Sequence, residues 1–189
     1  MLLNGVRSDG SCKEADPGIK GLERAMTSSL RGSVHLVADP ANLDGSVEEV
    51  FRLMLGANCS RQMKAVPSPG PDRESVTAVV GFGGQLSGAC VFRSSAPTAM
   101  SIAARMTGME FGEVDDTVKD AIGEICNMLA GAWKGKVPDL AANCGLSVPA
   151  VITGRDYNLH VQSPEFQLHH AYSFDGAFFE VTIVCDSLQ

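Results

Sequence analysis

Carboxylate and amide side chains recur about one helical turn apart between Asp115 and Trp133, and their spacing favours chemistry. Asp120, Glu124, Asn127 and Gly131 fall in one narrow stripe when each residue is rotated by about 100° around a helix axis. Two carboxylates a turn apart are typical of a proton-transfer pair or of a cation site. The stripe holds no His, Lys or Arg that would complete acid–base or nucleophilic machinery. By itself the stripe is therefore an incomplete active site.

The element that must position this stripe is one long amphipathic helix. Asp115 or Asp116 can cap its first turn, and Pro138 follows soon after its end. Its core-facing residues recur at helical spacing: Val118, Ala121, Ile122, Ile125, Leu129, Ala132 and Trp133. The stripe thus faces solvent or a partner. Small residues around it allow a protein surface to come close, namely Gly123, Cys126, Ala130 and Gly131. A solvated face with small residues by chance is the alternative.

Composition and charge exclude several classes of function. The chain has 189 residues, 44% of them hydrophobic, which predicts one globular domain with an appended segment. A net charge of -7 and a pI near 5.0 argue against binding to nucleic acid or to an anionic membrane. There is no apolar run long enough to span a bilayer and no secretory signal, so we expect a cytoplasmic protein. The partner is then a protein or a small molecule.

Metal binding is not expected. The six cysteines are scattered, without a C-x-x-C pair or zinc-like spacing, and most are expected to be buried thiols. His169 and His170 are adjacent on a predicted strand, so their side chains point to opposite faces of the sheet. We predict no metal site.

The first half of the chain predicts an extension followed by helices and a hairpin. Residues 1–42 lack periodicity and are expected to be mostly disordered, although residues 33–37 suit a short strand. Residues 43–187 form the predicted domain. Ser46 can cap a helix over residues 47–55, and a hairpin turning at Gly83-Gly84 is predicted over residues 76–92. A further helix begins near Pro97 and ends at Gly108.

After Pro138 the pattern becomes that of strands. We expect strands over residues 147–152 and 159–162, then a hairpin of residues 166–173 and 178–185 around Asp175-Gly176. The last strand is almost continuously apolar, which predicts a central position with both sides covered. Lys134 and Lys136 form a basic turn that either compensates the helix dipole or borders a docking surface. The predicted fold is α+β, with a largely antiparallel sheet covered by about three helices.

Asp120-x-x-x-Glu124-x-x-Asn127 resembles the D/S-x3-E-x2-N signature of the bacterial chemotaxis phosphatases CheC and CheX. The similarity extends from residue 46 to residue 186 and includes the flanking runs VTAVVGFGGQLSGACVF, AIGEICNMLAG and GLSVPAVITG. CheC-type members carry the signature twice. The first helix here, SVEEVFRLML, has no E-x-x-N, so the resemblance is to the single-site, CheX-like arrangement.

The resemblance implies a phosphatase that hydrolyses the aspartyl phosphate of a CheY-like response-regulator receiver. The receiver would supply the phospho-Asp, a Lys and Mg²⁺, so the phosphatase needs no cofactor of its own. Asn127 would orient the attacking water and Glu124 would pair with the receiver's Lys. Asp120, Gly123 and Gly131 would belong to the partner-binding surface. Relatives of this type form homodimers by joining their sheets, which predicts a homodimer here.

Two other readings stay open at this point. A receiver-binding adaptor of the same fold would use Glu124 without depending on Asn127. A small-molecule-binding or structural dimer would instead place its site in an apolar cavity away from the stripe.

Overall fold

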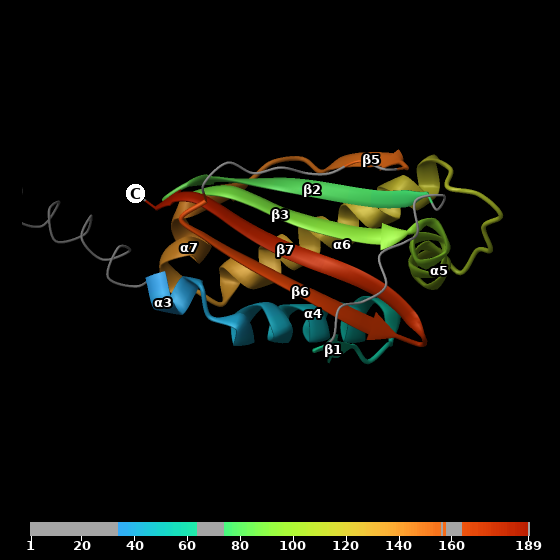
Figure 1. Cartoon of the computed structure of the whole chain (residues 1–189), viewed down its shortest axis with the longest axis horizontal. Coiled ribbons are helices and arrows are strands. Elements are labelled where there is room, and N and C mark those ends of the chain that lie inside the picture. Colours follow the sequence, from blue (N-terminus) through green and yellow to red (C-terminus); the bar gives the residue numbers. More distant parts are fainter. Residues whose placement is uncertain (1–33, 64–73, 156, 158–163, 189) are drawn as a thin grey trace, which may run out of the picture.

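The computed structural model describes residues 34–63, 74–155, 157 and 164–188, which form a sheet with helices against it (Figure 1). The helices are α3 (Val34–Val37), α4 (Pro40–Leu55), α5 (Ala96–Thr107), α6 (Asp116–Gly135) and α7 (Pro138–Asn143). The strands are β1 (Ser60–Gln62), β2 (Ser75–Gly84), β3 (Leu86–Ser95), β4 (Cys144–Leu146), β5 (Ala150–Gly154), β6 (Phe166–Phe174) and β7 (Ala177–Leu188).

The seven strands form one antiparallel sheet in the order β1-β6-β7-β3-β2-β4, with β5 also paired to β2. The predicted β2–β3 hairpin is present, but it turns at Gln85 rather than at Gly83-Gly84, which are the last two residues of β2. The β6–β7 hairpin turns at Asp175 and Gly176, which both adopt positive φ angles of 48° and 79°. The predicted α+β fold with a largely antiparallel sheet is thus confirmed.

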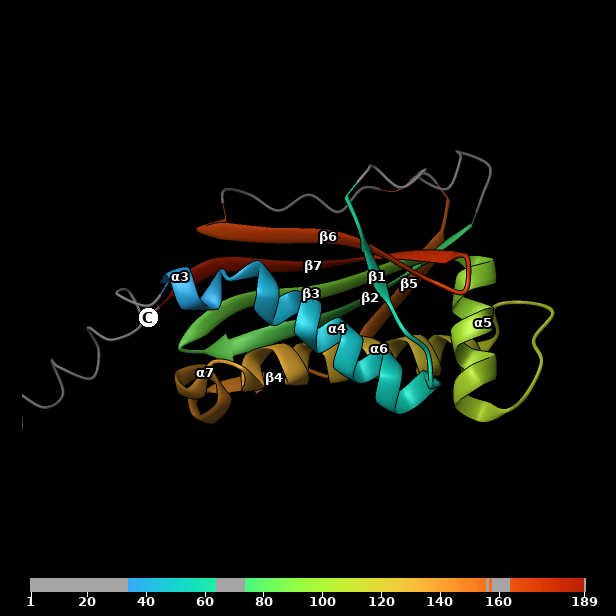
Figure 2. The ribbon, with the colours of Figure 1, turned by 90° about the horizontal axis from the view of Figure 1, so that it is seen from below.

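The helices lie against one face of this sheet, with α5 near one end (Figure 2). Strand β7 is central, between β3 and β6, as predicted. Its alternate residues Phe179, Val181 and Ile183 are buried on the helix side, whereas Phe178 is 42% exposed. The expectation that both sides are covered is therefore wrong for Phe178. Successive side chains of a strand point to opposite faces, so Phe178 and Phe179 cannot both reach the core although both are apolar.

Helix α6 is the central helix of this layer and packs on β2, β3, α4 and α5. Asp115 is its N-cap, and Oδ1 of Asp115 accepts a hydrogen bond from the backbone N–H of Val118 at 2.9 Å. Its predicted apolar face is buried, except that Ala132 is only partly so. Trp133 packs on Phe82 with ring centroids 5.2 Å apart. The prediction of one long amphipathic helix is confirmed.

The start of the domain differs from the prediction. Helix α4 begins at Pro40 with Asp39 as its N-cap, not at residue 47 with Ser46. Ser46 lies inside the helix, where its hydroxyl donates to the backbone oxygen of Asn42. Residues 34–37 are helical rather than a strand. The assignment of residues 1–42 to a disordered extension stays a prediction for residues 1–33, which lie outside the described part.

The segment after α6 also differs. Residues 138–143 form the short helix α7 before any strand, because Pro138 occupies the first turn of a helix rather than ending one. Of the strand predicted over residues 147–152, only residues 150–152 are strand, as the start of β5; residues 147–149 separate β5 from β4, which ends before the predicted range. The strand predicted at residues 159–162 lies outside the described residues. Within the described ranges, no helix is both long and apolar enough to cross a membrane.

Candidate active site

The stripe predicted on α6 lies on its outward side. Asp120 and Glu124 are exposed, and Asn127 and Gly131 are half-buried. Among the residues that the structure describes, the side chains of Glu124 and Asn127 form no hydrogen bond or ion pair. Both groups are therefore available to a partner.

Gly123 differs from the rest of the predicted partner-binding set because it is buried. A Cβ atom on Gly123 would lie 3.2 Å from the Cβ atom of Pro149, and one on Gly131 would lie 4.0 Å from Cδ1 of Leu146. The lack of side chains at the two glycines thus leaves room for residues 146–149 of the same chain to pack on α6. This gives them an internal packing role, beside which their predicted contact with a partner stays a prediction.

Asn127 lies between these two contacts. Gly123, Asn127 and Gly131 are spaced i, i+4, i+8, so they form one row along α6 about 12 Å long. The chain from Leu146 to Pro149 contacts both ends of the row, and three residues of extended chain cover about 10 Å. Residues 147 and 148 therefore lie between these two contacts, beside the part of α6 that bears Asn127.

Two other small residues expected near the surface face the core instead. Cys126 and Ala130 are fully buried. The Sγ atom of Cys126 lies 3.5 Å from the carbonyl oxygens of Ala78 and Cys90 on the sheet. The hydrogen bond with Cys126, together with burial, raises the pKa of the Cys90 thiol well above its usual range. The residue before Asn127 is thus an anchor of α6 on the sheet.

The two lysines at the end of α6 bind other elements. The Nζ atom of Lys134 donates to the backbone oxygens of Ala141 and Cys144, at 3.2 and 2.6 Å. The Nζ atom of Lys136 lies 3.0 Å from Oε2 of Glu49 on α4. Beyond the two roles predicted from the sequence, dipole compensation and a docking rim, these lysines therefore also fasten α7 and α4 to the end of α6.

Helix α4 offers no second copy of the site. Glu49 is followed three residues later by Arg52, where α6 has Asn127 after Glu124. Val50 and Phe51 between them are buried, as are their counterparts on α6. Glu49 is bound by Lys136. The amide is thus missing from α4 and the acid is occupied within the chain.

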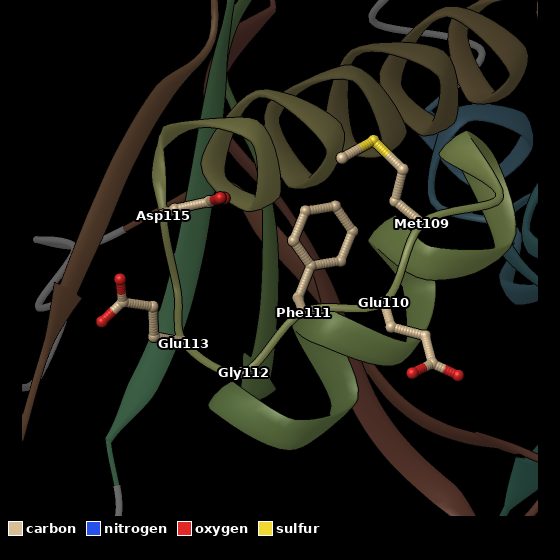
Figure 3. Close-up of a pocket in the computed structure, with 6 residues that line it drawn as sticks. All are labelled: Met109, Glu110, Phe111, Gly112, Glu113 and Asp115. Atoms are coloured by element: carbon tan, nitrogen blue, oxygen red, sulfur yellow. The ribbon is translucent and has the colours of Figure 1, made fainter.

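A hollow of about 400 Å³ lies in the loop between α5 and α6 (Figure 3). Met109 and Phe111 point toward α6, and the carboxylates of Glu110 and Glu113 point away from it. Asp115 at its edge is the α6 N-cap. The hollow is open and largely acidic, unlike the apolar cavity that a small-molecule site would require.

The two adjacent histidines point to opposite faces of β6, as predicted. Nδ1 of His169 lies 2.9 Å from Oγ1 of Thr182, whereas the buried His170 has Nδ1 2.9 Å from Oδ1 of Asp44. No group of three or more His, Cys, Asp or Glu in the described part of the chain is arranged to hold a metal ion. The absence of a metal site in the whole chain stays a prediction.

Asp44 is the centre of a polar cluster that joins α4 to the far edge of the sheet. Its carboxylate accepts from the hydroxyl of Tyr172 at 2.7 Å and pairs with Arg61 at 3.0 Å. Burial raises the pKa of Asp44, but the hydrogen bonds from Tyr172, His170 and Arg61 outweigh it and lower the pKa overall. Burial, with Asp44 adding to it, raises the pKa of Tyr172.

Sequence reasoning did not assign residues 147–149 to the site. Val148 is 86% exposed although it lies in a run that reads as a strand. The available signal was Pro149, because a proline inside a strand pattern indicates an edge or an irregularity.

Comparison with known proteins identifies the family of this chain. Residues 76–170, just over half of the chain, match the family model of the chemotaxis phosphatase CheX. The CheY-P phosphatase CheX of Thermotoga maritima is 32% identical over 118 residues, which cover 62% of this chain and 76% of that protein.

Solved structures share the fold at lower identity. The chemotaxis protein CheX from Vibrio vulnificus superposes with a TM-score of 0.66 at 20% identity, covering 79% of this chain and 97% of that chain. CheX in a CheX-CheY-BeF3-Mg complex from Borrelia burgdorferi gives 0.61 at 21% identity, with 78% and 97% covered. The family match, the level of identity and the outward Glu124 and Asn127 together lead to one conclusion: this chain belongs to the CheX family of chemotaxis phosphatases.

Proposed function

We propose that this protein hydrolyses the aspartyl phosphate of a CheY-like response-regulator receiver and so ends its signal. One observation carries the proposal: Glu124 and Asn127 lie on the outward side of α6 without partners among the described residues, in a member of a phosphatase family. The Thermotoga relative is named as a CheY-P phosphatase, and the Borrelia structure is a complex with CheY.

Asn127 would position the attacking water. A carboxamide oxygen can accept a hydrogen bond from water and direct the lone pair of the water oxygen at phosphorus, without taking the proton itself. The water oxygen then bonds to phosphorus as the bond from phosphorus to the aspartyl oxygen breaks. Inorganic phosphate leaves with the hydroxyl group, the receiver regains its carboxylate, and the remaining proton passes to solvent or phosphate. Such transfer depends mainly on positioning and electrostatics, so an amide suffices.

Glu124 would fix the docking register by pairing with the receiver's lysine. Its exposure in the free protein means that the charge is desolvated only on docking, when the lysine compensates for the lost hydration. Asp120, one turn earlier and also exposed, would extend the docking surface together with Gly131. Gly123 would contribute indirectly, because its lack of a side chain leaves room for Pro149 to pack on α6.

The metal ion in this scheme belongs to the receiver. Mg²⁺ bound there would neutralise charge on the phosphoryl oxygens. That the phosphatase has no cofactor of its own stays part of this proposal. We place the reaction in the cytoplasm, and we expect a homodimer formed by joining the sheets of two copies.

The test is the decay of phosphate from CheY-like receivers of the same organism. Each receiver is phosphorylated with a small-molecule phosphodonor, and decay is followed alone, with this protein and with Asn127→Ala. We expect faster decay that the variant loses. Binding of the receiver without faster decay in either form would contradict the phosphatase and identify a receiver-binding adaptor.

A further inference from the structure

The segment between β4 and β5 contains a bulge that turns one apolar side chain outward beside the candidate active site. Phe82 pairs with Leu146 and Val79 with Ala150, so Val80 and Gly81 on β2 face the three residues 147, 148 and 149. Three residues opposite two define a β-bulge, a feature that redirects side chains and is common beside active sites.

The bulge is held firmly on both sides. The backbone N–H of Ser147 donates to the carbonyl of Gly81 at 2.9 Å, and the N–H of Gly81 donates to Oγ of Ser147 at 2.8 Å. The Ser147 hydroxyl also donates to the backbone oxygen of Val148 at 2.9 Å. Pro149 rests on Gly123 and restricts the backbone of the residue before it. Val148 is therefore fixed in place before any partner arrives.

Val148 nevertheless packs against almost nothing. Its exposed fraction is 86%, whereas Val151 in the following strand is partly buried against the core. A side chain whose backbone is already fixed loses little conformational entropy on binding, so its burial against a partner contributes with little ordering cost. The bulge places this side chain next to the row that contains Asn127.

We propose that Val148 is a docking residue that inserts its side chain into an apolar part of the receiver surface bordering the phosphorylation site. The inference rests on the proposed function and names a contact for it. The occupant is the receiver because the bulge adjoins Asn127, so a receiver that places its phosphoryl group at Asn127 must cover Val148. Glu124 provides the charged contact of this surface and Val148 the apolar one.

The test compares Val148→Ala and Val148→Asp with wild type in the receiver phosphatase assay. Removing the two methyl groups is expected to raise KM about tenfold, because each buried methylene contributes about 0.8 kcal/mol. Aspartate is expected to raise KM further, since a charge would replace the apolar contact. The value of kcat should change less than about twofold, because Asn127 and Glu124 are untouched.

Met63→Ala is the matched control, since Met63 is 87% exposed and follows β1 at the opposite edge of the sheet. The control should leave KM within about twofold of wild type. All these sites are exposed, so the melting temperatures should stay within about 2 °C of wild type. A fall in kcat with KM unchanged would overturn the proposal, because Val148 would then position Asn127 rather than bind the receiver.

Binding to an unphosphorylated receiver carrying beryllofluoride and Mg²⁺, measured by fluorescence anisotropy, separates this inference from the proposed function. Wild type that binds without accelerating decay would refute the phosphatase, while weaker binding by Val148→Ala would still support the contact. Equal binding and equal KM for wild type and both variants would refute the contact alone. Sedimentation of each form without receiver completes the test, and a change of oligomeric state in Val148→Asp would overturn the proposal in favour of a second copy as the occupant.

Discussion

Gly123 on α6 lies directly beneath Pro149, so closely that a Cβ atom on Gly123 would stand 3.2 Å from the Cβ atom of Pro149. The glycine is therefore a contact between the helix that bears the candidate active site and the bulge beside it. Gly131, two turns further along, has a looser contact, since its Cβ would lie 4.0 Å from Leu146. The pair allows the same substitution to be compared at a tight and a loose position.

Gly123→Ala and Gly131→Ala are expected to change stability in opposite directions. Alanine in a helix gains about 1 kcal/mol over glycine. At Gly123 the constrained proline must shift to admit the methyl group, and such overpacking costs about 2 kcal/mol, which leaves a net loss of about 1 kcal/mol. At Gly131 the gain is retained. Urea unfolding of both variants measures the free energy of unfolding. Equal stabilisation of the two would contradict the prediction, because Pro149 would then shift without a loss of stability.

Substitutions in the stripe should separate docking from chemistry. Glu124→Gln is expected to lower kcat/KM more than about tenfold, chiefly through KM, because it removes the charge proposed to pair with the receiver's lysine. Asn127→Ala should lower kcat instead. Asn127→Asp should be at least as impaired, because it places a negative charge beside the phosphoryl group. The assay is receiver dephosphorylation at several receiver concentrations, and Asp120→Ala, at the outer position, serves as the milder comparison.

The decisive comparison is between kcat and KM of the Glu124 variant and those of the Asn127 variant. If Glu124→Gln and Asn127→Ala lowered kcat equally and left KM alone, the division of roles between them would be wrong.

The Asp44 cluster predicts a pH dependence of stability. The folded-state pKa of Asp44 lies below its ordinary value of 3.8, so its stabilisation is complete above about pH 4 and is lost as the pH falls through the folded pKa. Asp44→Asn should therefore unfold at lower urea than wild type at pH 7, by about 2 kcal/mol in free energy. The difference should shrink at pH 3. A difference of the same size at both pH values would contradict this assignment.

The two lysines at the end of α6 should differ in their contribution. Lys134 donates to two backbone carbonyls at the end of α7, and Lys134→Ala is expected to cost about 1 to 2 kcal/mol of unfolding free energy. Lys136→Ala breaks only an exposed ion pair with Glu49, which typically contributes less than about 1 kcal/mol. Chemical denaturation of both variants measures the two losses of unfolding free energy, and a larger loss for Lys136→Ala than for Lys134→Ala would contradict this prediction.

Local signals explain what the sequence could predict. Helix α6 combines a strong apolar period with a cap at Asp115, and the β6–β7 hairpin turns at Asp175-Gly176, a pair suited to a tight turn. In each case neighbouring residues alone determine the structure. The stripe of Glu124 and Asn127 follows from the helix period in the same way.

What the sequence could not predict depends on contacts between distant segments. Pro40 and Gly45 weaken the helical pattern of the first turns of α4 in the sequence. In the structure the start of this helix is stabilised by packing on the core as well as by the cap at Asp39. The bulge at residues 147–149 exists only through pairing with β2, which lies far away in the sequence. The burial of Gly123 follows from that bulge. The helix period alone cannot show which side of a helix a distant strand will cover.

The replacement of the amide by Arg52 on α4, together with the capture of Glu49 by Lys136, has a consequence for stoichiometry. Among the described helices, α6 is the one with an Asn three residues after a Glu on its outward side, so under the proposed function one chain would serve one receiver at a time. In a homodimer the two α6 faces would then dephosphorylate receivers independently, so the rate would be proportional to the number of chains.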